Sequence, residues 1–260
     1  GAALATLLSN VVSCVYLVLV MKKVAAAAPV SINPADARSV GRDELKKLFA
    51  VGVPSAMLTG LFDVANIFLN ALAASHGDLA LAAIGIVMKA ERLPNAINVG
   101  ICQGMLPLVA YNYASGNWER MKKVISTARF CGLVIAAVSF VLFEIFASGI
   151  VHVFLSTSVG NIADSTMTIG FAAVFLRIRC AASVPQFLNY SSSFCMQAVG
   201  YGSGTLLHAA VRELVFYIPF MYLLDSLFGI NGLVTALLAG ESCGALFAFL
   251  LWTRWKKTKL

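Results

Sequence analysis

Charged side chains are scarce in this sequence. They make up 12% of the 260 residues, whereas hydrophobic residues make up 60%. An ordinary soluble domain has about 25% charged residues, and its hydrophobic share is also lower. A globule of this length cannot bury so much apolar surface, so the composition excludes an ordinary soluble protein and predicts that a lipid bilayer covers the rest.

The sequence also lacks the motifs of common enzymes and pumps. It contains no HExxH, GxSxG or GxxxxGK[ST] motif, so neither a hydrolase nor an ATP-driven pump is supported. Its six cysteines are scattered through apolar stretches without a CxxC pair, and we expect them to be buried thiols. We therefore expect no enzyme, no metal site and no cofactor.

Seven apolar segments follow one another along the chain. Each is long enough to cross about 30 Å of hydrocarbon as a helix, and each is too continuous for a barrel strand. The predicted fold is therefore an all-α, polytopic transmembrane helix bundle. The segments cover residues 1–21, 48–75, 80–111, 124–155, 166–198, 204–224 and 230–253.

Basic residues alternate between the connections. Thirteen of the 19 Lys and Arg residues lie in 22–47, 120–123 and 254–260, whereas the loops at 76–79, 156–165 and 225–229 contain none. Positive residues gather in cytoplasmic loops, so we expect a multi-pass protein of the plasma membrane with a cytoplasmic C-terminus. The net charge of +7 is explained in the same way, and no nucleic-acid partner is expected.

The segment 48–75 contains a polar stripe. At 100° per residue, Ser55, Thr59, Asp63, Asn66 and Asn70 share a sector of about 80° on one helix. Polar groups are expensive in lipid, so this stripe is expected to face protein or water. It could line a cavity, or it could be a seam that holds helices together.

The segment 80–111 repeats the pattern. Glu91, Asn95 and Asn98 lie within a sector of about 60°, beside Pro94, which is expected to bend the helix. The alternative is that Glu91 only neutralises a nearby arginine. Two further basic residues, Lys89 and Arg92, point elsewhere and are expected to pair with headgroups or with acids on neighbouring helices.

The segment 166–198 has a third stripe, to which Arg179, Gln186 and Asn189 belong, whereas Arg177 points the opposite way. Both arginines could equally be counter-ions of acids on other helices. Glu241 lies in the last segment next to Gly240, and we prefer for it a structural pairing with an arginine. Candidate partners are Arg212 and Arg177.

Several runs resemble multidrug and toxic compound extrusion (MATE) transporters. The clearest are LKKLFAVGVPSAMLTGLFDVANIFLNALAASHGDLALAAIGIVMKAERL, near the start of their second lobe, and GICQGMLPLVAYNYASGNWERMKKV, with its Gln-Gly and Pro-Leu-Val motifs. The resemblance implies two six-helix lobes around a central cavity, and exchange of sodium ions or protons for organic, often cationic, compounds. The implied organisation is the last helix of a missing N-terminal lobe (1–21), a cytoplasmic inter-lobe linker (22–47), a six-helix C-terminal lobe (48–253) and a cytoplasmic basic tail (254–260).

Together the stripes and the resemblance predict a substrate and ion cavity. Asp63 or Glu91 is expected to help select cations, because proton and drug could compete for one buried carboxylate. Some members have an acid on the fourth helix of this lobe, where 166–198 has none, and others place the coupling acid in the first lobe. The expected cavity residues are Thr59, Asp63, Asn66, Asn70, Glu91, Asn95, Asn98, Gln103, Arg179, Gln186 and Asn189.

The expected partners are an organic cation or other small amphipathic substrate, the lipid bilayer and the missing N-terminal lobe. Two alternatives stay open. One is a lipid-linked oligosaccharide flippase of the same superfamily, whose cavity should be ringed with arginines. The other is a non-transporting membrane fragment, because half a cavity cannot alternate its access alone.

Overall fold

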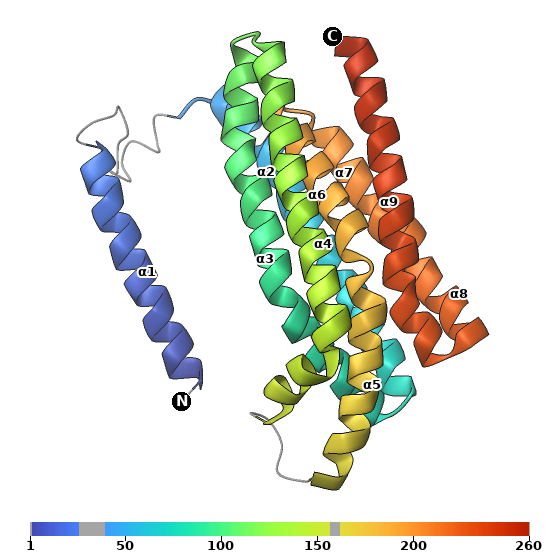
Figure 1. Ribbon diagram of the computed structural model, residues 1–260. Coiled ribbons are helices and arrows are strands. Elements are labelled where there is room, and N and C mark those ends of the chain that lie inside the picture. Colours follow the sequence, from blue (N-terminus) through green and yellow to red (C-terminus); the bar gives the residue numbers. More distant parts are fainter. Residues whose placement is uncertain (1, 26–39, 157–161, 260) are drawn as a thin grey trace. The chain divides into compact units, whose positions relative to one another are not determined.

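The computed structural model describes residues 2–25, 40–156 and 162–259, and the regular structure of these residues is helical (Figure 1). They fall into two compact units, Gly1–Phe49 and Ala50–Leu260. The first unit contains α1 (Ala2–Ala25) and the start of α2 (Arg42–Ser75). The described side chains of α1 are apolar for the most part and exposed, as in a helix whose surface lipid would cover. Most of the predicted linker lies outside the described residues, which exclude 26–39.

The second unit is a bundle of long helices. With α1 of the first unit included, six helices in the described ranges are long and apolar enough to cross a membrane, and the count reaches the predicted seven when one bent pair is taken as a single span. Part of the predicted loop 156–165 lies outside the described residues. After α2, the elements are α3 (Asp78–Ala114), α4 (Trp118–Ser156), α5 (Ile162–Cys180), α6 (Ser183–Ala198), α7 (Gly202–Ala210), the π-helical turn η2 (Val211–Tyr217), α8 (Ile218–Phe228) and α9 (Ile230–Lys259).

The bent pair corrects one expectation. Residues 166–198 are not one straight span, because α5 and α6 meet at an angle of 46° around Ala181 and Ala182. The cause is Pro185, whose ring would clash with the carbonyl of Ala181 and whose nitrogen cannot donate to it. In the first turn of a new helix the missing N–H costs little, so α6 begins just before the proline.

The segment before α8 contains a second irregularity. Pro219 cannot donate to the carbonyl of Val215, four residues earlier, and Val215 lies in η2. The chain here adopts the wider π-helical hydrogen bonding instead of ending the helix. Such turns often occur at functional sites, and η2 contains the charged neighbours Arg212 and Glu213.

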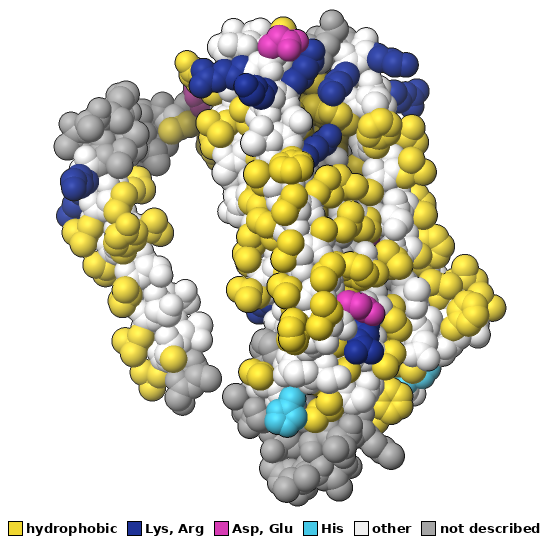
Figure 2. Space-filling model, viewed as in Figure 1, with side chains coloured by type: hydrophobic (Ala, Val, Ile, Leu, Met, Phe, Trp, Pro, Cys, Tyr) yellow, Lys and Arg dark blue, Asp and Glu magenta, His cyan; other side chains and the backbone are white. Residues whose placement is uncertain are grey.

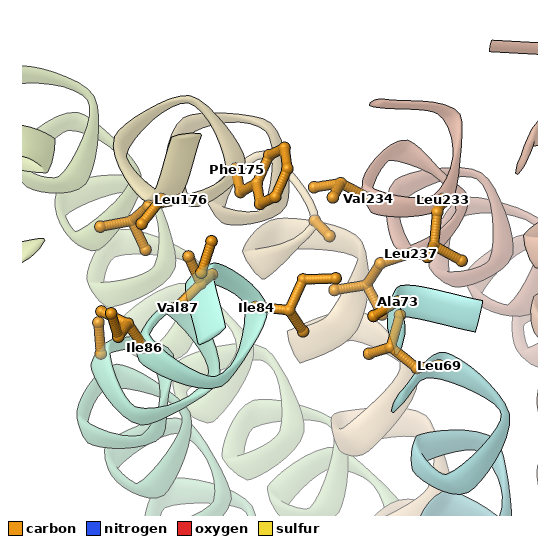
Figure 3. Packing of buried hydrophobic residues seen from close by; sticks show 14 of the residues in the cluster. Leu69, Ala73, Ile84, Ile86, Val87, Phe175, Leu176, Leu233, Val234 and Leu237 are labelled. Carbon is orange, nitrogen blue, oxygen red and sulfur yellow. The ribbon is translucent and has the colours of Figure 1, made fainter. Parts of the chain in front are cut away.

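The two larger of three apolar clusters in the described chain pack the bundle at different heights. Figure 3 shows the first, in which Ile84 of α3, Phe175 of α5 and Leu237 of α9 meet. The second includes Met105 of α3 and Trp252 of α9. Along both α3 and α9, polar residues lie between the two clusters. Lipid is as apolar as these side chains, so the clusters stabilise the bundle through close packing.

The two ends of the second unit differ in charge. Figure 2 shows Lys and Arg side chains gathered at the end where α3 meets α4 and where α9 finishes. Exposed members of this basic end include Arg120, Lys123 and Lys257. At the opposite end, His76 follows α2 and Asp225 lies in the last turn of α8. His76 Nε2 lies 2.6 Å from Asp225 Oδ1. Such an unequal distribution of Lys and Arg between the two ends of a helix bundle is typical of membrane proteins.

Candidate functional site

A cavity of about 360 Å³ opens between the two apolar clusters. It is walled by α2, α3, α5, α6, η2 and α9, so residues far apart in the sequence converge on it. Its volume is in the range of small-molecule sites, about 300–1,000 Å³. The lining residues are Phe62, Asn66, Met88, Lys89, Glu91, Arg92, Asn95, Arg179, Gln186, Tyr217 and Leu237.

One ion pair forms the polar wall of this cavity. The Arg179 guanidinium binds the Glu91 carboxylate through two nitrogens, Nε and Nη2. Nε lies 3.0 Å from Oε1 and 3.2 Å from Oε2, and Nη2 lies 3.1 Å from Oε2. Two parallel hydrogen bonds of this kind are geometrically specific and stronger than neutral ones. The alternative in which Glu91 neutralises an arginine is therefore the arrangement observed, and Glu91 is not a free carboxylate.

Two more basic side chains line the cavity. Lys89 and Arg92 were expected to pair elsewhere, yet both belong to the wall and neither forms an ion pair within the described ranges. Their backbone lies about 17–21 Å from the start of α3, far from either end of the helix. Both side chains are exposed, as their helical angle predicted, and they border the cavity because long basic side chains can reach around a helix.

Two hydrogen-bond donors in the wall have no well-aligned partner. Nη1 of Arg179 and the hydroxyl of Tyr217 are both buried, and neither makes a hydrogen bond of normal geometry among the described residues, although the two side chains interact with each other. Buried donors normally have partners, so orphans beside a cavity are a place where a ligand or water would bind.

A second ionic cluster is buried next to η2. Arg212 pairs with Glu213, its neighbour in sequence, and its Nη1 lies 3.8 Å from Glu241 Oε2 on α9. Nδ2 of Asn189 on α6 donates to the same Glu241 oxygen at 2.6 Å and to the Glu241 carbonyl at 2.8 Å. The preferred pairing of Glu241 with Arg212 is confirmed. Arg177 instead lies exposed and donates to the Glu144 carbonyl at 3.2 Å.

Further polar groups complete this buried network. His208 Nε2 lies 3.0 Å from Asn189 Oδ1, and its Nδ1 lies 2.8 Å from the Ser193 hydroxyl. The aromatic ring of Tyr190 lies 5.7 Å from the Arg212 guanidinium carbon. Gly244 lets α9 approach, because a Cβ there would come within 2.8 Å of Arg212 Cγ. One arginine thus faces two buried carboxylates.

The structure brings together some of the predicted site residues and not others. Buried outside the lining are Asn98 and Asn189, the latter in the network around Arg212. On the exposed surface of the described chain lie Thr59, Asp63, Asn70 and Gln103. The side chain of Ser55 lies outside the described part. The cavity contains Asn66, Glu91, Asn95, Arg179 and Gln186.

Sequence reasoning missed three groups near the site. Tyr217 gave no signal, because one tyrosine in an apolar span is ordinary. Glu213 and His208 could have been noticed, since a charged pair and a histidine within the span 204–224 are expensive in lipid. Their partners come from other helices, so only the fold identifies them.

A polytopic helix bundle with a polar cavity halfway along its helices is the architecture of a membrane transporter lobe. The MatE family model matches residues 54–223, and this chain belongs to the MatE family. It is accordingly a transporter-family protein and not an enzyme.

Known proteins agree with this assignment. Multidrug export protein MepA of Staphylococcus saprophyticus is 29% identical over 251 residues, which cover 96% of this chain and 53% of the relative. MepA of Staphylococcus aureus strain MRSA252 has the same identity and coverage. A solved structure of a mutant of the Vibrio cholerae MATE transporter VcmN matches with a TM-score of 0.84 at 18% identity, over 94% of this chain and 54% of that one. The chain therefore spans about half the length of the curated relatives it matches.

Proposed function

We propose that this chain forms the second lobe of a secondary active antiporter that exports small organic compounds in exchange for sodium ions or protons. The observation that supports this most directly is the polar cavity between the two apolar clusters, in a chain of the MatE family. A bundle that served only as a scaffold would have little reason to keep ion pairs and amides at this depth. The relatives are multidrug export proteins, which favours the same function.

The buried network suggests where coupling could occur in this lobe. Glu213 and Glu241 share the single cation Arg212, so one carboxylate charge has no protein counter-charge within the network. An unbalanced buried charge costs several kcal/mol, and a proton or a monovalent cation would remove that cost. Binding or release of such an ion would then alter how α9 packs against η2. Asp63, exposed on α2, is a second candidate carboxylate for the cation selection expected from the sequence.

The proposed orientation places the basic end in the cytoplasm of a plasma-membrane protein. It rests on the gathering of Lys and Arg at that end and on the rule that such residues stay inside. A cysteine replacing Ser226, in a variant without other cysteines, should be labelled by an impermeant maleimide from outside the cell. A cysteine replacing Ser115 should be labelled only after permeabilisation. The opposite labelling pattern would reverse the orientation.

One observation favours a second candidate. Three basic side chains line the cavity, whereas the sequence alone assigned it only Arg179. A cavity with three basic residues resembles more closely the arginine-rich cavity expected of a lipid-linked oligosaccharide flippase, which binds a diphosphate. The antiporter remains the better supported function, because the chain matches export proteins over 96% of its length.

The test uses liposomes that contain the complete two-lobe transporter with this chain as its second half. An imposed sodium or proton gradient should drive uphill movement of an organic fluorescent probe, and Glu241→Gln should uncouple that movement from the gradient. Movement that is independent of both gradients, or that occurs only with a lipid diphosphate, would refute the antiporter proposal.

A further inference from the structure

The charges around the cavity do not suit an organic cation. Its lining contains the three cations Lys89, Arg92 and Arg179 and a single anion, Glu91. Glu91 is already bound by Arg179 through both of its oxygens. The wall therefore has an excess of two positive charges, and its one carboxylate has little capacity left for another cation.

Among the described residues, no carboxylate besides Glu91 lines the cavity. Lys89 and Arg92 make no ion pair in the part of the chain that the structure describes. Asp63 is the next residue after Phe62 of the lining, yet it does not line the cavity and is absent from every ion pair there. The side chains of Lys89 and Arg92 are exposed on the described chain and border the cavity, so an anion that enters the cavity can reach them.

Hydrogen-bond donors point to the same partner. The buried Arg179 Nη1 and Tyr217 hydroxyl lack well-aligned partners, and both residues belong to the lining. Arginine has donors only, and it binds carboxylates and phosphates with particular preference. Asn66, Asn95 and Gln186 offer additional amide donors at the same wall.

The rest of the lining is apolar and bulky. Phe62, Met88 and Leu237 border the polar wall, so an apolar body could rest beside the charged groups. Small-molecule sites commonly combine such a surface with a few polar groups that fix orientation.

We propose that this cavity binds the anionic group, a carboxylate or a phosphate, of a small amphipathic substrate, with Arg179 and Arg92 as its principal donors. The proposal rests on the proposed transport function and names the substrate class of that same site. It replaces the expectation of an organic cation for this lobe. Glu91 holds the Arg179 fork in place and competes with the incoming anion for it.

The test measures binding to this chain in phosphatidylcholine nanodiscs by isothermal titration calorimetry, with empty discs to correct for partition into lipid. The probes are 2-naphthoate and 2-naphthylmethylammonium, which share a ring system and differ in the sign of their charge. Naphthoate should bind at least about tenfold more tightly, the effect of one or two charge-assisted hydrogen bonds. A tighter complex with the ammonium probe would overturn the proposal.

Substitutions test whether the cavity residues cause the preference for the anionic probe. Arg92→Gln should weaken naphthoate binding about tenfold. Arg177→Gln is the matched control, because Arg177 is exposed outside the cavity, and it should change nothing. Glu91→Gln should strengthen naphthoate binding, a gain that a misfolded protein could not produce. Equal losses in the Arg92 and Arg177 variants, or a loss in the Glu91 variant, would show that the cavity is not the site.

A last arm separates the possible sources of the anion. Discs that contain phosphatidylglycerol should leave naphthoate binding intact if the ligand is a soluble acid. If the anionic lipid competes, the site takes a lipid headgroup of the same chemistry. Loss of transport in liposomes with binding preserved in discs would refute the transport function alone, and preserved transport without anion preference would refute this inference alone.

Discussion

The two ionic clusters of the bundle differ in both balance and surroundings. Arg179 and Glu91 form a one-to-one pair in the wall of a cavity, and the glutamate side chain is 21% exposed. Arg212 faces two carboxylates, Glu213 and Glu241, and none of the three side chains is more than 6% exposed. The first cluster can exchange partners with a ligand, whereas the second can be balanced only by an ion that enters the protein.

The Arg179–Glu91 pair is therefore suited to ligand recognition, whereas the Arg212 network mainly affects the stability of the bundle. A pair at a cavity can be altered at moderate cost, because water or ligand can replace a lost partner. A buried cluster cannot be rescued in this way, so removal of its only cation leaves charges stranded. Substitutions in the buried cluster should therefore change stability more than substitutions in the cavity pair.

Arg212→Leu should lower the free energy of unfolding the most, by about 3–5 kcal/mol, because it strands two buried carboxylates. Unfolding in detergent micelles, followed by tryptophan fluorescence, measures the change. Arg177→Leu removes an exposed arginine from the same bundle and should cost less than about 1 kcal/mol. Similar losses in the two variants would mean that the network is not a charged cluster.

Gly244→Ala should destabilise the bundle by about 1–3 kcal/mol, because the new Cβ would overpack the buried network. It would come within 2.8 Å of Arg212 Cγ and 3.2 Å of Asn189 Oδ1. Gly149→Ala on α4 is the control, since nothing lies within 4 Å of its Cβ, and helix propensity should make it neutral or slightly stabilising. If Gly244→Ala melts like Gly149→Ala, α9 does not pack tightly at this point.

Glu241→Gln should not lower the free energy of unfolding and should raise it slightly, in contrast to Arg212→Leu, because it leaves one arginine with one carboxylate and removes the unbalanced charge. The same melting assay compares the two variants. The cavity pair has one cation and one carboxylate. Glu91→Gln and Arg179→Gln should therefore change the free energy of unfolding by similar amounts. A loss for Glu241→Gln as large as that for Arg212→Leu would contradict the proposed imbalance of the buried network.

Ionic strength should have the smallest effect and should act on the cavity alone. Raising salt from about 0.01 M to 0.15 M shortens the Debye length from about 30 Å to about 8 Å, which screens a partly exposed site. Naphthoate affinity should fall a few-fold, while the melting temperature of the ligand-free chain stays within about 1 °C. A melting temperature that changes in parallel with the affinity would mean that water reaches both clusters.

The general fold was predictable because lipid imposes strong rules on sequence. Apolar length located the spans, and the asymmetry of basic residues between loops predicted a bundle with one basic end. The α5–α6 break was missed, although Pro185 was visible, because a proline can bend a span or divide it. The π-turn around Arg212 was also missed, although Pro219 was visible, because a proline that cannot donate to the carbonyl four residues earlier can end a helix or widen it.

The site was predictable only in part. Helical periodicity identified Glu91, Asn95 and Gln186, whose side chains point where their backbone position directs them. It did not place Lys89 and Arg92 at the cavity, which their long side chains reach from other faces of α3. Periodicity gives the direction of a Cβ, whereas the charge of a cavity depends on where flexible side chains end.

The most direct test of this division of roles is ligand-dependent melting of the chain in nanodiscs. The melting temperature without ligand reports the stability of the chain. Its increase with the concentration of 2-naphthoate reports binding. Arg92→Gln should melt like the native chain and lose most of the naphthoate shift. Glu241→Gln should melt at a higher temperature, because it removes the unbalanced buried charge, and keep the full shift. If both variants lose stability and shift in the same proportion, the two clusters form one site, and the separation between a substrate cavity and a buried network is wrong.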